Sequence, residues 1–218
     1  MEQKIKVALV DDHVLLRHAL ANLINSSDEY TVTIEASNGK ELIAKLNKDA
    51  APDIAILDLN MPVMDGHDTA AWLQQNHPTI HVLMLTMYDS ELILIRLLKT
   101  GVKGFMKKDI HPTELLFALQ SVVEQGYYYS AHTSSKLAGL FLENEDKVPL
   151  FQKVMLSDQE LEFLKYASTE LTYKEIAQKM RMNPRAIDGI RDGLFTRLDV
   201  KSRIGLTMYA IKQGLVNF

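Results

Sequence analysis

Short apolar runs of the kind found in β-strands alternate with amphipathic segments over the first 126 residues. We expect strands at Ile5–Val10, Tyr30–Glu35, Ile54–Leu57, His81–Thr86 and Gly104–Lys107. Apolar residues spaced three and four apart predict helices between them, at Leu16–Ile24, Glu41–Asn47, Asp65–Gln75, Glu91–Leu98 and Pro112–Glu124. Several of the strands are apolar throughout, which is typical of a parallel sheet covered on both faces. The pattern therefore predicts an α/β fold with a doubly wound, five-stranded parallel sheet.

The remainder of the chain differs from this part in charge and in pattern. Residues 1–151 hold 13 basic and 20 acidic side chains, whereas residues 152–218 hold 11 basic and 8 acidic ones. Helix-start signals stand at Ser157, Thr172, Asn183 and Ser202. Four short helices, with those near 172–180 and 184–198 joined by a tight turn, predict a small all-α helix-turn-helix domain. Its positive charge suggests nucleic acid as a partner.

A connection is expected between the two parts. We predict a first domain over residues 1–126, a linker over 127–151 and a second domain over 152–218. The linker contains three consecutive tyrosines, Tyr127, Tyr128 and Tyr129, which we expect to pack against the preceding helix, and a short helix at Ser134–Leu142.

Composition excludes several classes of protein. The chain has no cysteine, so disulfides, cysteine-ligated zinc, iron–sulfur clusters and a cysteine nucleophile are all excluded. No stretch approaches the roughly 18 apolar residues of a membrane span, and the apolar run at the N-terminus is too short for a signal peptide. We therefore expect a cytoplasmic protein.

Charged and polar residues stand where the predicted strands end. Asp11 and Asp12 follow the first strand, Asp58 the third, Thr86 ends the fourth, and Lys108 lies just past the fifth. The carboxyl ends of parallel strands meet at one edge of the sheet, where such folds bind ligands. Three pooled carboxylates repel one another unless a cation lies among them, and oxygen ligands suit Mg²⁺. A lysine and a threonine opposite the ion can bind an incoming phosphoryl group.

These residues also carry a resemblance to a known family. The segments Val10–His13 and Leu57–Gly66, together with Thr86 and Lys108, resemble the receiver domain of two-component response regulators over residues 4–126, a flavodoxin-like fold. Residues 156–216 resemble the LuxR-type helix-turn-helix, on Leu156-Ser157, Glu160, Leu164, Leu171-Thr172, Lys174 to Ala177, Leu198, Val200 to Arg203 and Tyr209-Ala210. Together the two halves resemble the NarL/FixJ family of transcription regulators.

The resemblance implies a role for each site residue. Asp58 is expected to accept the phosphoryl group from a sensor histidine kinase. Mg²⁺ is expected to bind Asp12, Asp58 and the backbone carbonyl of Asn60 directly, and Asp11 through a water. Thr86 and Lys108 would hold the phosphoryl oxygens, and Phe105 stands at the place of the aromatic switch residue.

Two details of this site depend on the sequence itself. Lys107 and Lys108 are adjacent, and because neighbours along a strand point to opposite faces, only one can reach the site. The family spacing favours Lys108. None of the seven histidines is predicted to bind metal, and we expect His13 simply to begin the loop into the first helix.

In the second domain the helix at Pro184–Leu198 is expected to enter the major groove of DNA. Eight basic side chains of residues 172–203 are candidates for phosphate contacts: Lys174, Lys179, Arg181, Arg185, Arg191, Arg197, Lys201 and Arg203. Asp188, Gly189 and Asp192 are assigned to the same surface. We expect a homodimer when the protein is phosphorylated.

The DNA-facing helix departs from the family pattern. Relatives often carry a lysine, a small or polar residue and a histidine where Asp188, Gly189 and Ile190 stand. Two interpretations remain open. Either this face is degenerate and binding is weak, or Gly189 and Gly193 let the backbone approach the groove while Asp188 accepts a hydrogen bond from cytosine N4.

The leading hypothesis is a phosphorylation-dependent, DNA-binding transcription regulator rather than an enzyme, with only self-phosphorylation from a donor and slow self-dephosphorylation as chemistry. One alternative is a phosphohydrolase that forms an aspartyl phosphate, but Asn60 stands where such enzymes usually need a second aspartate. The other is a phosphorylation-dependent interaction module that does not bind DNA.

Overall fold

The structure is a computed structural model of the 218-residue chain. It describes residues 4–46, 51–87, 94, 97–131, 133–135, 156–213 and 215–216. The described residues up to 135 form one compact unit and those from 156 onward form another. None of the helices in these ranges is long and apolar enough to cross a membrane.

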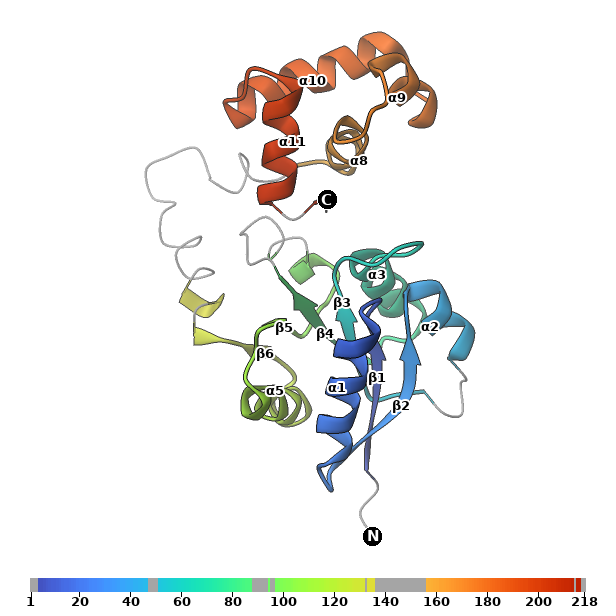
Figure 1. Ribbon diagram of the computed structural model, residues 1–218, viewed down its shortest axis with the longest axis vertical. Coiled ribbons are helices and arrows are strands. Elements are labelled where there is room, and N and C mark those ends of the chain that lie inside the picture. The colour runs from blue at the N-terminus through green and yellow to red at the C-terminus, as the bar shows by residue number, and fades with distance from the viewer. Residues whose placement is uncertain are drawn as a thin grey trace. The chain divides into compact units, whose positions relative to one another are not determined.

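A six-stranded, all-parallel sheet forms the first unit (Figure 1). Its strands run in the order β2-β1-β3-β4-β5-β6. Their bounds are β1 Ile5–Val10, β2 Tyr30–Ala36, β3 Ile54–Asp58, β4 His81–Thr86, β5 Gly104–Lys107 and β6 Tyr128–Tyr129. The doubly wound α/β fold and all five predicted strands are confirmed.

The sixth strand is a correction to the predicted five-stranded sheet. Tyr128 and Tyr129 pair in parallel with Gly104 and Phe105 of β5. Tyr128 also packs as predicted against the preceding helix, since its ring meets Phe117 edge-on and its hydroxyl donates to Glu114 at 2.6 Å. Strand pairing was missed because a two-residue strand is too short to produce a recognisable pattern.

Helices cover the sheet on both faces. They are α1 Val14–Asn25, α2 Gly39–Lys45, α3 Gly66–Asn76 and α5 Pro112–Gln125. Leu20 and Ile24 of α1 share one core cluster with Leu115 and Leu119 of α5, on one face of the strands. The buried side chains of α2 and α3, including Leu42 and Leu73, lie outside that cluster. The predicted helix Glu91–Leu98 lies mostly outside the described residues. In this part of the chain, residues 94 and 97–99 are described as helical.

The second unit is a bundle of helices with a core of its own. Its helices are α8 Asp158–Ala167, α9 Tyr173–Lys179, α10 Pro184–Leu198 and α11 Arg203–Lys212. Ser157 and Thr172 each complete a capping box with the glutamate three residues on, and Asn183 and Ser202 cap the other two helices. Phe163, Leu194 and Leu206 are fully buried at the centre of the bundle.

The helix-turn-helix bounds agree with the predicted ones. Ile187 and Leu194 of α10 are fully buried, and Leu198 packs against the same core. Residues 134 and 135 of the predicted helix Ser134–Leu142 are helical, and the rest of that helix and most of the predicted linker fall outside the described residues.

Candidate functional site

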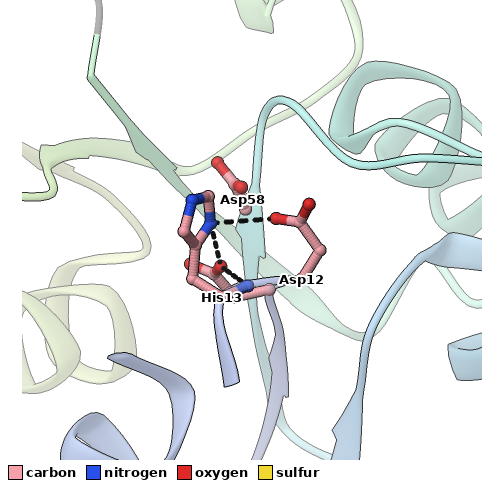
Figure 2. A group of neighbouring side chains, drawn as sticks. Asp12, His13 and Asp58 are labelled. Atoms are coloured by element: carbon pink, nitrogen blue, oxygen red, sulfur yellow. Dashed lines mark hydrogen bonds and ion pairs between the residues drawn. The ribbon is translucent and has the colours of Figure 1, made fainter. Parts of the chain in front are cut away.

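The carboxyl ends of four strands bring the predicted site residues to one edge of the sheet. Asp58 ends β3, Thr86 ends β4, and Asp11 follows β1 directly. All three side chains are buried. Burial is unusual for the two carboxylates, Asp11 and Asp58, unless they are paired. Figure 2 shows Asp58 beside Asp12 and His13 at this edge. The convergence predicted from the strand ends is therefore present.

Lys108 is the lysine that enters the site. Its Nζ lies 2.8 Å from Asp58 Oδ2 and 2.9 Å from Asp11 Oδ2, and the three side chains are each less than a tenth exposed. The backbone N–H of Lys108 donates to the carbonyl of Thr86, which ties it to the end of β4. Lys107, by contrast, is exposed. One ammonium thus bridges two carboxylates, and of the two adjacent lysines Lys108 is the one that reaches the site.

The site changes the acidity of both partners of this ion pair. Burial raises the pKa of Asp58 to about 6, with a further increase from the Asp11 charge, against the lowering effects of Lys108 and of the Asn60 N–H. Burial lowers the pKa of Lys108, but its hydrogen bonds and charge interactions with Asp58 and Asp11 outweigh this, so that its pKa is raised. The single ammonium therefore does not fully offset the effect of burial on the Asp58 carboxylate.

The donor set fits a divalent cation. Asp11 Oδ2, Asp12 Oδ1 and Asp58 Oδ2 are buried, and none has a hydrogen bond of good geometry, although Lys108 or His13 lies within ion-pair distance of each. Ligand atoms of Asp11, Asp12, His13 and Asp58 lie within 4.8 Å of one another. Buried carboxylate oxygens without a donor are the groups that a hard cation satisfies. The site is therefore suited to a metal ion.

Asn60 and Gly66 shape the loop that follows Asp58. The N–H of Asn60 donates to Asp58 Oδ1 at 3.3 Å, and the N–H of Gly66 donates to the carbonyl of Leu59 at 2.9 Å. A Cβ on Gly66 would lie 2.2 Å from the carbonyl oxygen of Asp58. Only glycine allows the loop to return this close to the strand end.

Two residues of the site were missed by the sequence analysis. The ring of His13 reaches back to the carboxylates of Asp11 and Asp12, with Nδ1 at 3.1 and 2.9 Å from their oxygens. Arg17 donates from Nη1 to the backbone carbonyl of Asp11 and pairs through Nε with Glu35 of β2. His13 does begin α1, as its N-cap. The missed signal was that this position lies directly beside two carboxylates.

Phe105 and Thr86 line a cavity next to the site. Phe105 is already buried, and its ring centroid lies 5.6 Å from that of Tyr129. The cavity has a volume of 450 Å³ and is also lined by Met106, His111 and Thr133 among others. Because of this cavity, the side chains nearest Thr86 have room to change position.

Several of the predicted DNA-binding residues lie on the surface of the helical bundle. Lys174 of α9, Arg185 of α10, Arg181 in the turn between these helices, and Lys201 before α11 are exposed. Arg181 has a left-handed backbone at φ 54°, and its N–H donates to the carbonyl of Gln178 at the end of α9. These cations are accessible to a polyanion.

Two other predicted DNA-binding arginines are bound within the bundle. Arg197 pairs with Glu160 of α8. Arg203 donates to the carbonyls of Ala167 and Thr169 at 2.9 and 2.6 Å, and its guanidinium lies over the ring of Tyr173. Both therefore hold helices together, whatever else they contact.

The middle of α10 carries a charge cluster of its own. Arg191 donates to Asp188 at 2.8 Å and to Asp192 at 2.9 Å. No atom lies within 4 Å of where a Cβ would stand on Gly189 or Gly193, so both glycines face open space. This surface offers both donors and acceptors.

The chain is similar over nearly its whole length to bacterial regulatory proteins. It is 29% identical over 217 residues to the oxygen regulatory protein NreC of Staphylococcus haemolyticus, covering 98% of this chain and 100% of that protein. The NreC of Staphylococcus epidermidis is 28% identical with the same coverage. These names describe regulatory proteins.

Solved structures extend the similarity to the fold. The response regulator ChrA of a heme-sensing two-component system is 25% identical with a TM-score of 0.52, covering 98% of this chain and 99% of that one. RcsB from Salmonella enterica serovar Typhimurium, bound to promoter P1flhDC in the presence of the phosphomimetic BeF3−, has a TM-score of 0.70 at 22% identity, covering 95% and 98%.

The match to a family model covers the whole region that carries the carboxylate site. Residues 7–120, which run from β1 into α5 and include Asp11, Asp58, Thr86 and Lys108, match the model of the response regulator receiver domain. The chain belongs to the response regulator receiver domain family.

Proposed function

We propose that this protein is a phosphorylation-dependent transcription regulator that accepts a phosphoryl group on Asp58 from a sensor histidine kinase and binds promoter DNA as a dimer. The observation that carries the proposal is the buried contact of Lys108 with both Asp58 and Asp11, at 2.8 and 2.9 Å. An ammonium held against a carboxylate nucleophile is the arrangement that phosphoryl transfer needs, because charge builds up on the transferred oxygens.

In the transfer, one carboxylate oxygen of Asp58 attacks the phosphorus of the phosphohistidine. The P–N bond breaks, its electron pair goes to the imidazole nitrogen, and an aspartyl phosphate forms. Lys108 then pairs with phosphoryl oxygens, and the Thr86 hydroxyl donates to another. Thr86 and Lys108 are joined through their backbones, so a shift of one is transmitted to the other.

The receiver site is also proposed to hold Mg²⁺. Asp12, Asp58 and the carbonyl of Asn60 would bind it, with Asp11 acting through a water. The ion supplies positive charge that offsets the repulsion between the carboxylates and the incoming phosphoryl group. The buried oxygens of Asp11, Asp12 and Asp58, of which two share a single ammonium, support this assignment.

The DNA-binding part of the proposal rests on the helical bundle. Exposed cations on α9, α10 and the turn between them can neutralise backbone phosphates, while α10 enters the major groove. The solved structures of RcsB with promoter DNA have the fold of this chain. Dimer formation is the step through which phosphorylation is proposed to act, since a dimer can bind two half-sites at once.

The test combines one phosphodonor with one variant. Acetyl phosphate and Mg²⁺ are expected to label the wild-type protein, to increase its self-association in sedimentation, and to strengthen its retention of genomic DNA fragments. Asp58→Ala is expected to lose all three responses, with the same folded circular dichroism spectrum. Labelling that continues in Asp58→Ala would overturn the assignment of the nucleophile. Normal labelling without any DNA retention would overturn the transcriptional part and leave a phosphorylation-dependent interaction module.

A further inference from the structure

His13 occupies an unusual position at the receiver site. As the N-cap of α1 it makes no side-chain capping bond, and its ring turns toward the carboxylates (Figure 2). Nδ1 lies 2.9 Å from Asp12 Oδ1 and 3.1 Å from Asp11 Oδ1. The backbone N–H of His13 donates to the same oxygen of Asp11 at 2.8 Å, and this hydrogen bond fixes the position of the His13 backbone beside Asp11.

These spacings match those between neighbouring ligands of one metal ion. An octahedral ion with ligands at about 2.1 Å places adjacent ligand atoms about 3.0 Å apart. Nδ1 stands at that separation from both oxygens, and Asp12 Oδ1 is buried without a hydrogen-bond partner. The ring would therefore need little movement to share an ion with Asp12.

We propose that His13 Nδ1 is an additional ligand of the receiver's divalent cation, and that this nitrogen makes the site prefer transition ions such as Mn²⁺ and Co²⁺ over Mg²⁺. The inference rests on the metal site in the proposed function and adds to it a selectivity that no carboxylate supplies. It reverses the prediction from the sequence that no histidine binds metal.

The chemistry of the ligand gives the direction of the preference. Mg²⁺ favours oxygen ligands and gains little from an imidazole, whereas affinity for nitrogen rises from Mn²⁺ toward Co²⁺ and Ni²⁺. With the proton on Nε2, the Nδ1 lone pair points toward Asp11 and Asp12, between which the ion is proposed to bind. Lys108 Nζ lies 3.5 Å from Nδ1, as expected if that lone pair faces the site.

A second account of the same contacts makes a different prediction. His13 could act only as a cation that pairs with Asp11 and Asp12. Removing a counter-cation changes the affinity for every divalent ion in the same direction, because it changes only the local charge. Removing a nitrogen ligand weakens the binding of transition ions and leaves Mg²⁺ nearly unchanged.

The experiment measures dissociation constants for Co²⁺ and Mg²⁺ on the full chain by calorimetry. The variants are His13→Gln and, as a matched control, His18→Gln, because His18 is an exposed histidine on the same helix. For His13→Gln we expect the Co²⁺ affinity to fall by about tenfold or more, which corresponds to about 1.4 kcal/mol. We expect the Mg²⁺ affinity of the same variant to stay within about twofold of the wild-type affinity. His18→Gln should match wild type for both ions.

A spectroscopic readout separates ligation from charge. Mn²⁺ bound to the wild-type protein should show electron spin echo modulation from ¹⁴N, which is absent in His13→Gln and present in His18→Gln. Equal loss of Co²⁺ and Mg²⁺ affinity, or no nitrogen modulation in the wild type, would overturn the proposal.

The outcome is distinguishable from a failure of the proposed function. Labelling of the wild-type protein by acetyl phosphate in Mg²⁺ tests the proposed function and needs no variant of His13. If the wild-type protein is labelled while the metal selectivity of His13→Gln is unchanged, only the role of His13 is wrong. If the wild-type protein is not labelled at all, the proposed function fails independently.

Discussion

Glu160 of α8 and Arg197 of α10 form an ion pair inside the helical bundle. The side chain of Glu160 is 18% exposed and that of Arg197 28% exposed, so water screens the pair only in part. The same carboxylate accepts hydrogen bonds from the N–H and the hydroxyl of Ser157, at 2.7 and 3.0 Å. One side chain therefore caps α8 and joins it to α10.

Glu160→Gln should destabilise the bundle in a pH-dependent way. Burial raises the pKa of Glu160, but the hydrogen bonds from Arg197 and Ser157 outweigh it and hold the pKa below its ordinary value of 4.5. A carboxyl whose pKa is lowered in the folded state adds stability above its unfolded pKa and loses it as the pH falls through the folded one. We expect a loss of about 1–3 kcal/mol at pH 7 that shrinks below pH 4.5.

The measurement is urea unfolding followed by far-ultraviolet circular dichroism at several pH values. Trp72, the only tryptophan, lies in α3 of the receiver, so its fluorescence reports that unit alone. The receiver transition should not move in Glu160→Gln. If Glu160→Gln lowers the urea midpoint of the helical bundle by the same amount at pH 7 and at pH 3, the charge-based account is contradicted.

Arg203→Ala should lower stability although Arg203 was predicted to contact DNA. Its guanidinium donates to two carbonyls at the end of α8, those of Ala167 and Thr169, and truncation leaves them without this donor. Hydrogen bonds from a charged donor contribute about 1.5–3 kcal/mol each. Lys201→Ala is the control, because Lys201 is exposed and its truncation should change stability by less than about 0.5 kcal/mol. The free energy of unfolding of the helical bundle in urea is measured for both variants. Equal losses of stability in Arg203→Ala and Lys201→Ala would contradict the prediction.

The sequence predicted the strands and the site because both follow from local patterns. Apolar runs ending in Asp11, Asp58 and Thr86 define the strands and the edge where their ends meet. Alternation along the strand allowed only one of Lys107 and Lys108 to reach the site, the family spacing favoured Lys108, and Lys108 does reach Asp58. Apart from that choice, these inferences need only the order of residues along a strand and the rule that parallel strand ends converge.

What could not be predicted depends on contacts distant in sequence. Gly104 begins β5, and a Cβ there would lie 2.4 Å from the carbonyl oxygen of Tyr128. The need for glycine at this position can be understood only once the pairing of β5 with β6 is known. Likewise, Arg197 carries the charge of a DNA-binding residue, and its pairing with Glu160, 37 positions earlier, cannot be read from helix periodicity.

Removal of divalent cations should abolish labelling of Asp58 by acetyl phosphate. The clustered carboxylates of Asp11, Asp12 and Asp58 repel an incoming phosphoryl group unless a divalent cation adds to the single positive charge of Lys108. Excess chelator should therefore suppress the rate of labelling, and restored Mg²⁺ should recover it. Radiolabel incorporation with and without chelator checks this. Undiminished labelling in chelator would show that Lys108 alone supplies the required charge.

Arg185→Ala should weaken DNA binding without changing which sequences are preferred. Arg185 is exposed in the first turn of α10, and no hydrogen bond holds its side chain among the described residues. A cation there contacts a backbone phosphate, so its loss lowers the slope of log affinity against log salt by about 0.9. Binding to the selected site at a series of salt concentrations measures the slope. An unchanged slope would place Arg185 outside the interface.

Asp188→Ala tests the choice between a degenerate α10 surface and one that reads bases. Asp188 is 51% exposed, and one of its oxygens accepts a hydrogen bond from Arg191 at 2.8 Å. Asp188 is followed by Gly189, around which space is open, and cytosine N4 is the donor available to a carboxylate in the major groove.

If Asp188 reads a base, its removal should relax the preference at one position of the site by about 1–3 kcal/mol. Affinity for non-specific DNA should stay level or rise, because a charge that phosphates repel is gone. Arg191 keeps its second partner, Asp192, at 2.9 Å, so the variant should not release that arginine to make a new contact. Asp192→Ala is the matched control, since it removes the same charge one position beyond Arg191 and should leave the selected motif intact. Selection of sites from a random pool with each variant decides the question: if Asp188→Ala returns the wild-type motif, Asp188 reads no base and the degenerate surface is correct.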